Sequence, residues 1–192
     1  MTNMIRIKLA DQNARYIDQD NENLDRRQFI REYTKNGMQA DERYRKENPN
    51  YKEKGIVEWN ERTHGVRCPT TGMEARKSKL CVTDNGIGMS KEELVETISG
   101  LGISSTIKAA DPNFGVGAKI SGFTQNKAGL MIHTFQNGNG LVAVVKYHEE
   151  EDAYAFMELD PDGGEYKYAI KDDRVPLVAK EIITNGHGTI IT

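Results

Sequence analysis

The residues best suited to chemistry lie in one short stretch, Thr83 to Met89, which reads Thr-Asp-Asn-Gly-Ile-Gly-Met. The apolar run Leu80-Cys81-Val82 before it predicts a strand, so a carboxylate, Asp84, is expected where that strand ends. Gly86 and Gly88 carry no side chains and let a ligand approach the main chain closely. A flat, hydrogen-bonding ligand such as an adenine suits these residues, with its exocyclic amine donating to the carboxylate.

The face of such a ring would pack on the glycine backbone and on Met89. A hairpin turn is the alternative, because Asn85-Gly86 is a strong turn signal. The next residues, Ser90 to Leu94, predict the start of a helix in which Ser90 caps the first turn and Glu93 bonds back to it. We expect this helix to end near Ser99-Gly100.

A second group with chemical potential lies on a long helix predicted from Leu24 to about Glu47. Glu32, Asn36 and Gln39 are four and three residues apart, so their side chains are neighbours at one edge of an apolar arc. They suit a carboxylate base and an amide metal ligand that face a cleft, or else a solvated flank. Arg27, Arg31 and Lys35 are expected to point elsewhere. The arc itself consists of Phe29, Ile30, Tyr33, Ala40 and Tyr44.

A third group closes a segment of small residues that begins at Gly100 and is typical of a mobile loop. The segment ends in Gly115-Val116-Gly117-Ala118-Lys119 and leads into a short helix predicted from Ala118 to Gln125. Amides at a helix start together with Lys119 favour an anion site. The spacing is neither that of a Walker loop nor that of the dinucleotide fingerprint, because Ile120 stands where a third glycine is needed. A flexible loop without a ligand is the alternative.

The rest of the chain predicts a sheet. Period-two alternation and the Asn-Gly turn at 137–140 favour antiparallel hairpins. A turn-rich stretch with Gly65, Pro69 and Gly72 separates two of the early strands. The expected strands are Met4–Leu9, Ile56–Trp59, Ser78–Thr83, Leu130–Gln136, Leu141–Tyr147, Tyr154–Leu159, Tyr166–Ile170 and a last one entered from the turn at Asn185, with a short helix at Pro176–Lys180.

Composition limits the class of protein. The 192 residues suit one domain, 1–192, and a net charge of −3 gives no general attraction to nucleic acid. No run approaches the roughly 20 apolar residues of a membrane span, and no signal peptide is visible, so we expect a cytoplasmic protein. Cys81 is expected in a buried strand. Cys68 is expected in a loop with His64 nearby, and the alternative is that these two residues form a metal-binding pair. The strand that runs to Thr192 suggests the N-terminal part of a longer protein with a further C-terminal domain.

Four motifs follow one another along the chain: Glu32-x-x-x-Asn36, Asp84-x-Gly86-x-Gly88, Gly115-x-Gly117-x-Lys119 and Gly188-Thr189. In this order they resemble the GHKL ATPase superfamily of DNA gyrase B subunits, ninety-kilodalton heat-shock chaperones, sensor histidine kinases and MutL. The resemblance spans nearly the whole chain. It implies the Bergerat fold, an α/β (α+β) two-layer sandwich with a mostly antiparallel mixed sheet, helices on one face and a mobile ATP lid at 100–117.

The resemblance also implies roles for these residues. The acid matching Asp84 accepts a hydrogen bond from the adenine amine, and the threonine matching Thr189 supports that contact, often through water. The acid matching Glu32 is the general base that activates water, and the amide matching Asn36 holds Mg²⁺. The segment that ends at Lys119 closes over the phosphates, where Lys119 and loop amides can hold developing charge.

We therefore expect this domain to bind ATP or ADP and to hydrolyse ATP in the presence of Mg²⁺, slowly when the domain is isolated. We expect closure of the lid to drive conformational change or homodimerisation of a larger protein. The alternatives are an ATP-sensing dimerisation module that hydrolyses little, and a kinase. Gln39 stands where many family members have Asp, which leaves the Mg²⁺ affinity open. Glu32 argues against histidine kinases, as does the lack of a preceding phosphoacceptor helix. The amino-acid sequences of residues 104–106 and 114–119 most resemble those of the MORC and chaperone-like branches.

Overall fold

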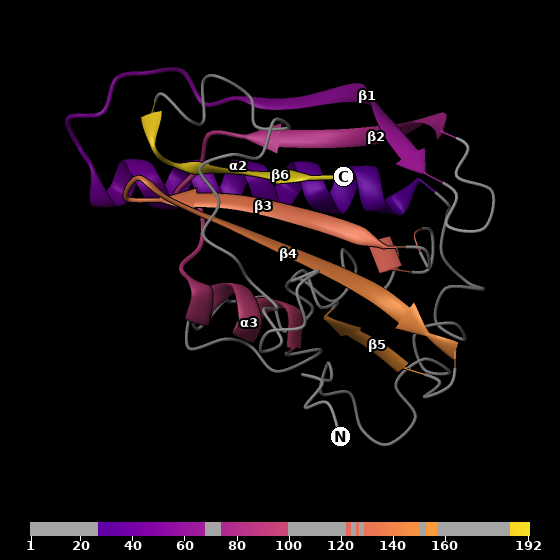
Figure 1. The fold of residues 1–192 in the computed structure, drawn as a ribbon. Coiled ribbons are helices and arrows are strands. Elements are labelled where there is room, and N and C mark those ends of the chain that lie inside the picture. The colour runs from indigo at the N-terminus through magenta and orange to yellow at the C-terminus, as the bar shows by residue number, and fades with distance from the viewer. Residues whose placement is uncertain are drawn as a thin grey trace.

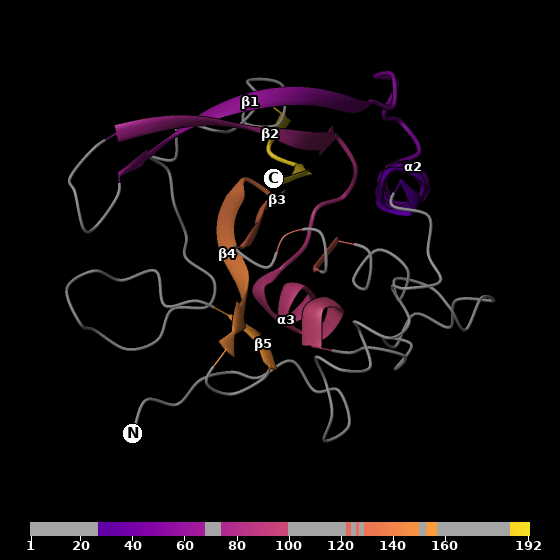
Figure 2. The same ribbon diagram turned by 90° about the vertical axis from the view of Figure 1, so that its right-hand side faces the viewer.

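The computed structural model describes residues 27–67, 74–99, 122–123, 126, 129–149, 153–156 and 185–192. These residues form an antiparallel sheet with two helices, α2 (Gln28–Glu47) and α3 (Lys91–Ser99), on one face (Figures 1 and 2). The α+β sandwich expected from the sequence is confirmed. The predicted elements at 4–9, 166–170 and 176–180, the segment 100–121 with the proposed lid, and most of the predicted helix at 118–125 lie outside the described residues.

The sheet has six strands in the order β1-β2-β6-β3-β4-β5, and every described pairing is antiparallel. Consequently β6, which comes last in the sequence, lies in the middle of the sheet between β2 and β3 (Figure 1). The strands are β1 Val57–Arg67, β2 Glu74–Asp84, β3 Leu130–Gln136, β4 Asn139–His148, β5 Ala153–Phe156 and β6 Gly188–Ile191.

Two strands are longer than the sequence indicated. β1 continues through Gly65, which was expected in a turn-rich stretch, and β2 begins at Glu74 rather than at Ser78. The two strands pair continuously from Val57 opposite Asp84 to Arg67 opposite Glu74. Such a ladder tolerates one interior glycine, because the partner strand still satisfies the backbone hydrogen bonds.

The turn between β3 and β4 confirms the predicted hairpin. Asn137 and Gly138 both have positive φ, 52° and 75°, as a two-residue type I′ turn requires. β4 starts immediately after them, at Asn139, which is two residues earlier than predicted.

The long helix α2 spans Gln28–Glu47 and ends where the sequence predicts, before Pro49. The side of the helix that faces the sheet carries the buried residues Tyr33 and Gly37 and the half-buried Phe29, at steps of four residues. Ile30 is exposed, so its assignment to the buried arc was wrong. The reason is geometric: Ile30 lies about 100° around the helix from Phe29, beyond the face that the sheet covers.

Successive side chains of the central strands point to opposite faces, and both faces are buried. The face toward the helices carries Val82, Ile132 and Ile191, which pack with Tyr33, Leu94 and Phe123 in the main core. The opposite face carries Cys81, Phe135 and Ile190, so the predicted burial of Cys81 is confirmed. Among the described residues, no helix is long and apolar enough to cross a membrane.

Candidate functional site

Three polar side chains lie side by side on the helix-facing side of the central strands. Asp84 of β2, Thr189 of β6 and Thr134 of β3 are direct partners in the strand pairing. We call these three residues the polar row. Directly opposite residues have Cβ atoms roughly 5 Å apart, so adjacent members of the row are neighbours. The next row along the same strands is the apolar set Val82, Ile191 and Ile132, so the polar row forms the border of the main core.

Asp84 is 9% exposed, and its Oδ1 atom accepts a hydrogen bond of 2.9 Å from the Gly86 N–H. Burial raises the pKa of Asp84 to about 7, while hydrogen bonds from the backbone N–H groups of Gly86 and Thr189 oppose the rise and Asp41 adds to it. A buried carboxyl in this state gains from any ligand that brings hydrogen-bond donors to it.

The two threonines of the polar row join β6, β3 and the loop after β2. Thr134 Oγ1 accepts from the Met89 N–H at 2.9 Å and lies 3.2 Å from Thr189 Oγ1 and 3.3 Å from the Gly188 carbonyl oxygen. Sequence reasoning missed Thr134. The sequence did contain one indication of its burial: Thr134 lies in a predicted strand among apolar residues, on the same face as Ile132.

The glycines of the Asp84–Met89 loop are needed for packing. Gly88 has a φ of 71°, and a Cβ there would overlap the carbonyl oxygen of Phe135 on β3. A Cβ on Gly86 would overlap Ala40 of α2, and the neighbouring Ile87 N–H donates to the Ala40 carbonyl at 3.1 Å. The missing Cβ atoms face α2 and β3, so the loop packs closely between these two elements. The approach of a ligand to the backbone of these glycines stays a prediction.

Asn85 anchors the same loop to the chain before β1. Its Oδ1 accepts from the Ile56 N–H at 2.7 Å, and its Nδ2 donates to the Lys54 carbonyl at 2.9 Å. The loop then leads into α3, which spans Lys91–Ser99, and not into a pairing strand. The hairpin interpretation of Asn85-Gly86 is therefore wrong.

The start of α3 is held by the predicted capping box. The Glu93 N–H donates to Ser90 Oγ at 3.2 Å, and the Ser90 N–H donates to Glu93 Oε2 at 2.9 Å. Although burial opposes it, hydrogen bonds from Ser90 and Gln136 and the charge of Arg43 lower the pKa of Glu93. Since Gln136 ends β3, the cap also fixes α3 to the sheet.

His187, which precedes β6, is a second residue that sequence reasoning missed. It is 3% exposed, and its Nδ1 lies 2.9 Å from the Gly86 carbonyl oxygen. Its ring stacks on Tyr44 of α2 with centroids 3.8 Å apart. His187 therefore links β6, the Asp84–Met89 loop and α2. The turn containing His187 was visible in the sequence, but the long-range contact was not.

The helix α2 carries the second group of candidates over this loop. A Cβ on Gly37 would lie 3.1 Å from Asp84 Cβ, so α2 passes directly over Asp84 at the residue after Asn36. Asn36 itself is half-buried. Glu32 is 12% exposed and pairs with the Arg31 guanidinium at 2.8 Å. The Oε1 atom of Gln39 is buried and has no hydrogen-bond partner within the described part of the chain.

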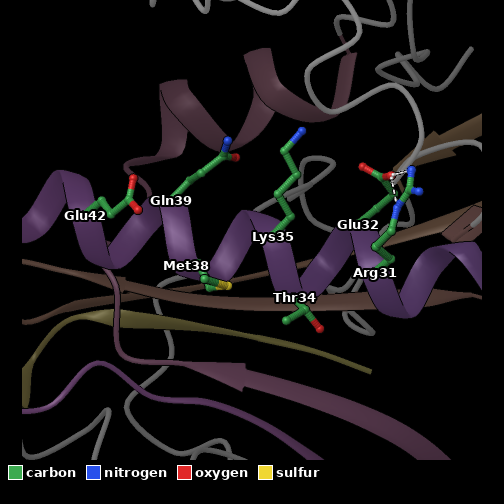
Figure 3. Close-up of a pocket in the computed structure, with 7 residues that line it drawn as sticks. All are labelled: Arg31, Glu32, Thr34, Lys35, Met38, Gln39 and Glu42. Carbon is green, nitrogen blue, oxygen red and sulfur yellow. Dashed lines mark hydrogen bonds and ion pairs between the residues drawn. The ribbon is translucent and has the colours of Figure 1, made fainter.

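Beside α2 lies a cavity of about 650 Å³ (Figure 3). Lys35 points from the helix on the same side as Glu32 and Gln39 (Figure 3), so the expectation that it points elsewhere was wrong. Lys35 lies three and four residues from these two, which makes all three neighbours on the helix surface. Asn36 is not among the described residues that line the cavity: Arg31, Glu32, Thr34, Lys35, Met38, Gln39 and Glu42.

The structure thus brings Asp84, Gly86, Gly88, Met89 and Thr189 together, and it packs the helix of Glu32 and Asn36 against them. The predicted phosphate segment, Gly115 to Lys119, lies outside the described residues.

The fold is an α+β sandwich with helices on one face of the sheet, and the candidate site contains a buried carboxylate, Asp84, at the end of strand β2. Residues 27–189 match the family of histidine kinase-, DNA gyrase B- and HSP90-like ATPases, and the chain belongs to this family. Membership supports ATP binding. The sequence matches none of the curated proteins with which it was compared.

Proposed function

We propose that this domain binds ATP with its adenine amine donating to Asp84, and that it hydrolyses the nucleotide with Mg²⁺ bound. The observation that carries the first part is the buried Asp84 carboxyl, whose pKa is raised by burial to about 7. A donor from the ligand would offset the cost of burying the ionised form. Thr189, its direct partner on β6, supports the same contact.

The proposed loop contacts follow from the position of Asp84. Gly86 and Gly88 keep the loop backbone close to α2 and β3, and Met89 follows them. In this proposal, Met89 and the loop backbone pack against the base. Adenine is favoured over a base with a carbonyl at the same position, because a carbonyl oxygen facing a carboxylate leaves both acceptors without a donor.

The phosphate end is proposed to lie along α2. Asn36 would hold Mg²⁺, with Gln39 adding an amide oxygen in place of the usual carboxylate. The buried, unpartnered Oε1 of Gln39 fits this role, since Mg²⁺ prefers oxygen ligands and keeps several waters. The metal would supply charge neutralisation at the phosphates. Glu32 would accept the proton of the attacking water.

Lys119 and the segment Gly115-Val116-Gly117-Ala118 are proposed to close over the phosphates as part of a lid at 100–117. Closure would then drive conformational change or homodimerisation of a larger protein. An ATP sensor that hydrolyses little is the second candidate, and the contact between Arg31 and Glu32 favours it. A guanidinium on the carboxylate competes with the water that the base must approach.

The adenine assignment is tested by titration calorimetry with ADP and with inosine diphosphate, which carries a carbonyl oxygen in place of the amine. We expect the wild-type protein to prefer ADP. Asp84→Asn should weaken ADP binding about tenfold to a hundredfold, the loss expected for a charge-assisted hydrogen bond, and should reduce the preference.

Glu58→Gln is the matched control, because it neutralises an exposed carboxylate on the neighbouring strand β1. It should leave both affinities unchanged. An Asp84→Asn protein with wild-type ADP affinity would contradict the assignment.

A further inference from the structure

Thr134 is completely buried in the centre of the sheet, and one hydroxyl group there serves three neighbours. Its oxygen lies within hydrogen-bond distance of the Met89 N–H, the Gly188 carbonyl and the Thr189 hydroxyl. Two of these neighbours, Met89 and Thr189, belong to the proposed adenine site. The third, Gly188, is the residue before Thr189 on β6.

A count of donors and acceptors limits the direction of these bonds. A threonine hydroxyl has one hydrogen to donate and two lone pairs to accept. The Met89 N–H can only donate, so it occupies one lone pair of Thr134, and the Gly188 carbonyl can only accept, so a bond to it uses the Thr134 hydrogen. When Thr134 donates to Gly188, its remaining lone pair accepts from the Thr189 hydroxyl, and both lone pairs of Thr189 are free to accept in turn.

We propose that Thr134 is a positioning residue for base recognition, a role that rests on the proposed adenine site. It holds the Met89 backbone and turns the Thr189 hydroxyl so that Thr189 and Asp84 both act as acceptors. Two neighbouring acceptors favour a base whose facing edge carries an amino group. The amino group donates to them directly or through a bridging water. The same row disfavours an edge that presents a carbonyl oxygen.

A purely structural role would also explain a buried threonine between two strands, because cross-strand threonine pairs stabilise sheets. The two roles differ in one measurable quantity, the ratio of ADP affinity to inosine diphosphate affinity. Loss of a structural contact lowers both affinities together or only the melting temperature. Loss of the positioning contact changes the ratio.

The test uses Thr134→Val, which keeps the shape and removes the hydroxyl, and Thr134→Ser, which keeps the hydroxyl. Both affinities are measured by calorimetry on proteins whose folding is checked by thermal unfolding. We expect Thr134→Val to lower the affinity ratio about tenfold, as expected for one lost hydrogen bond, and Thr134→Ser to retain the wild-type ratio. Thr83→Val is the matched control, because Thr83 is buried on the opposite face of the sheet. It should keep the ratio.

A double-mutant cycle with Thr189→Val tests the route of the effect. If Thr134 acts through Thr189, Thr134→Val changes the ratio in the wild-type background and adds nothing in the Thr189→Val background. If Thr134→Val fails to fold, Thr134→Ala carries the test and must lower the ratio by a similar factor. An unchanged ratio in these variants, or additive effects, would overturn the proposal. A wild-type protein that binds neither nucleotide would instead refute the proposed function itself.

Discussion

The two ends of the proposed site are built differently. At the base end, Asp84, Thr134 and Thr189 come from three strands, and none is more than 9% exposed. Backbone N–H groups donate to Asp84 and Thr134, and the Thr134 hydroxyl bonds to that of Thr189. At the phosphate end, the candidates that the structure describes, Glu32, Asn36 and Gln39, come from the single helix α2, and Glu32 forms an ion pair with the adjacent residue Arg31. The base end is therefore preorganised, whereas the arrangement at the helix depends on side chains that a ligand must still order.

The largest effect is expected at the helix. Glu32→Gln removes the proposed base but keeps the size of the side chain, so phosphate release should fall about 10²–10⁴-fold while ATP affinity stays close to wild type. Glu42→Gln is the matched control, since Glu42 lines the same cavity and should leave turnover unchanged. Normal turnover in Glu32→Gln would show that Glu32 is not the base. A wild-type protein that releases no phosphate with Mg²⁺ would favour the sensor.

The second-largest effect is expected on stability, and it tests whether the base end is rigid. Gly88→Ala puts a Cβ against the Phe135 carbonyl at a positive φ, so the free energy of unfolding should fall by roughly 3 kcal/mol or more. Gly138→Ala also has a positive φ, 75°, but its Cβ would meet nothing within 4 Å. It should cost only about 1–2 kcal/mol, the strain of the left-handed conformation. Equal losses for the two variants in urea unfolding would mean that the loop can move away from β3.

The smallest effect concerns pH. Because burial raises the pKa of Asp84 to about 7, the ionised form that is proposed to accept from adenine is lost as pH falls below 7, and ADP affinity should drop up to tenfold per pH unit. The raised pKa stabilises the fold in acid, and this contribution is lost as pH rises from about 4 through 7. Asp84→Asn should remove both dependences. An ADP affinity of the wild-type protein that stays constant from pH 8 to pH 6 would contradict the ionised contact.

The parts of the site that the sequence predicted correctly depend on local signals. The position of Asp84 at a strand end, the cap formed by Ser90 and Glu93, and the turn at Asn137 each follow from a few consecutive residues. Local patterns of this kind decide where a strand, a cap or a two-residue turn forms.

The parts that the sequence did not predict depend on pairing between distant strands. Thr134 and His187 became candidates only when the register put them beside Thr189 and Gly86, 55 and 101 residues away. The extension of β1 through Gly65 likewise required its partner strand. The orientation of Lys35 is different, because its spacing from Glu32 and Gln39 was readable on the helix and was misjudged.

The central place of β6 has a consequence for the newly made chain. Until residues 188–191 have been synthesised, β2 and β3 lack the strand between them and each presents an unpaired edge of backbone N–H and C=O groups. At about 5–20 residues per second, translation needs several seconds to pass from β3 to β6. During that interval the nascent chain has open strand edges and no Thr189. The contact that Thr189 is proposed to make with nucleotide therefore cannot form before β6 has been synthesised.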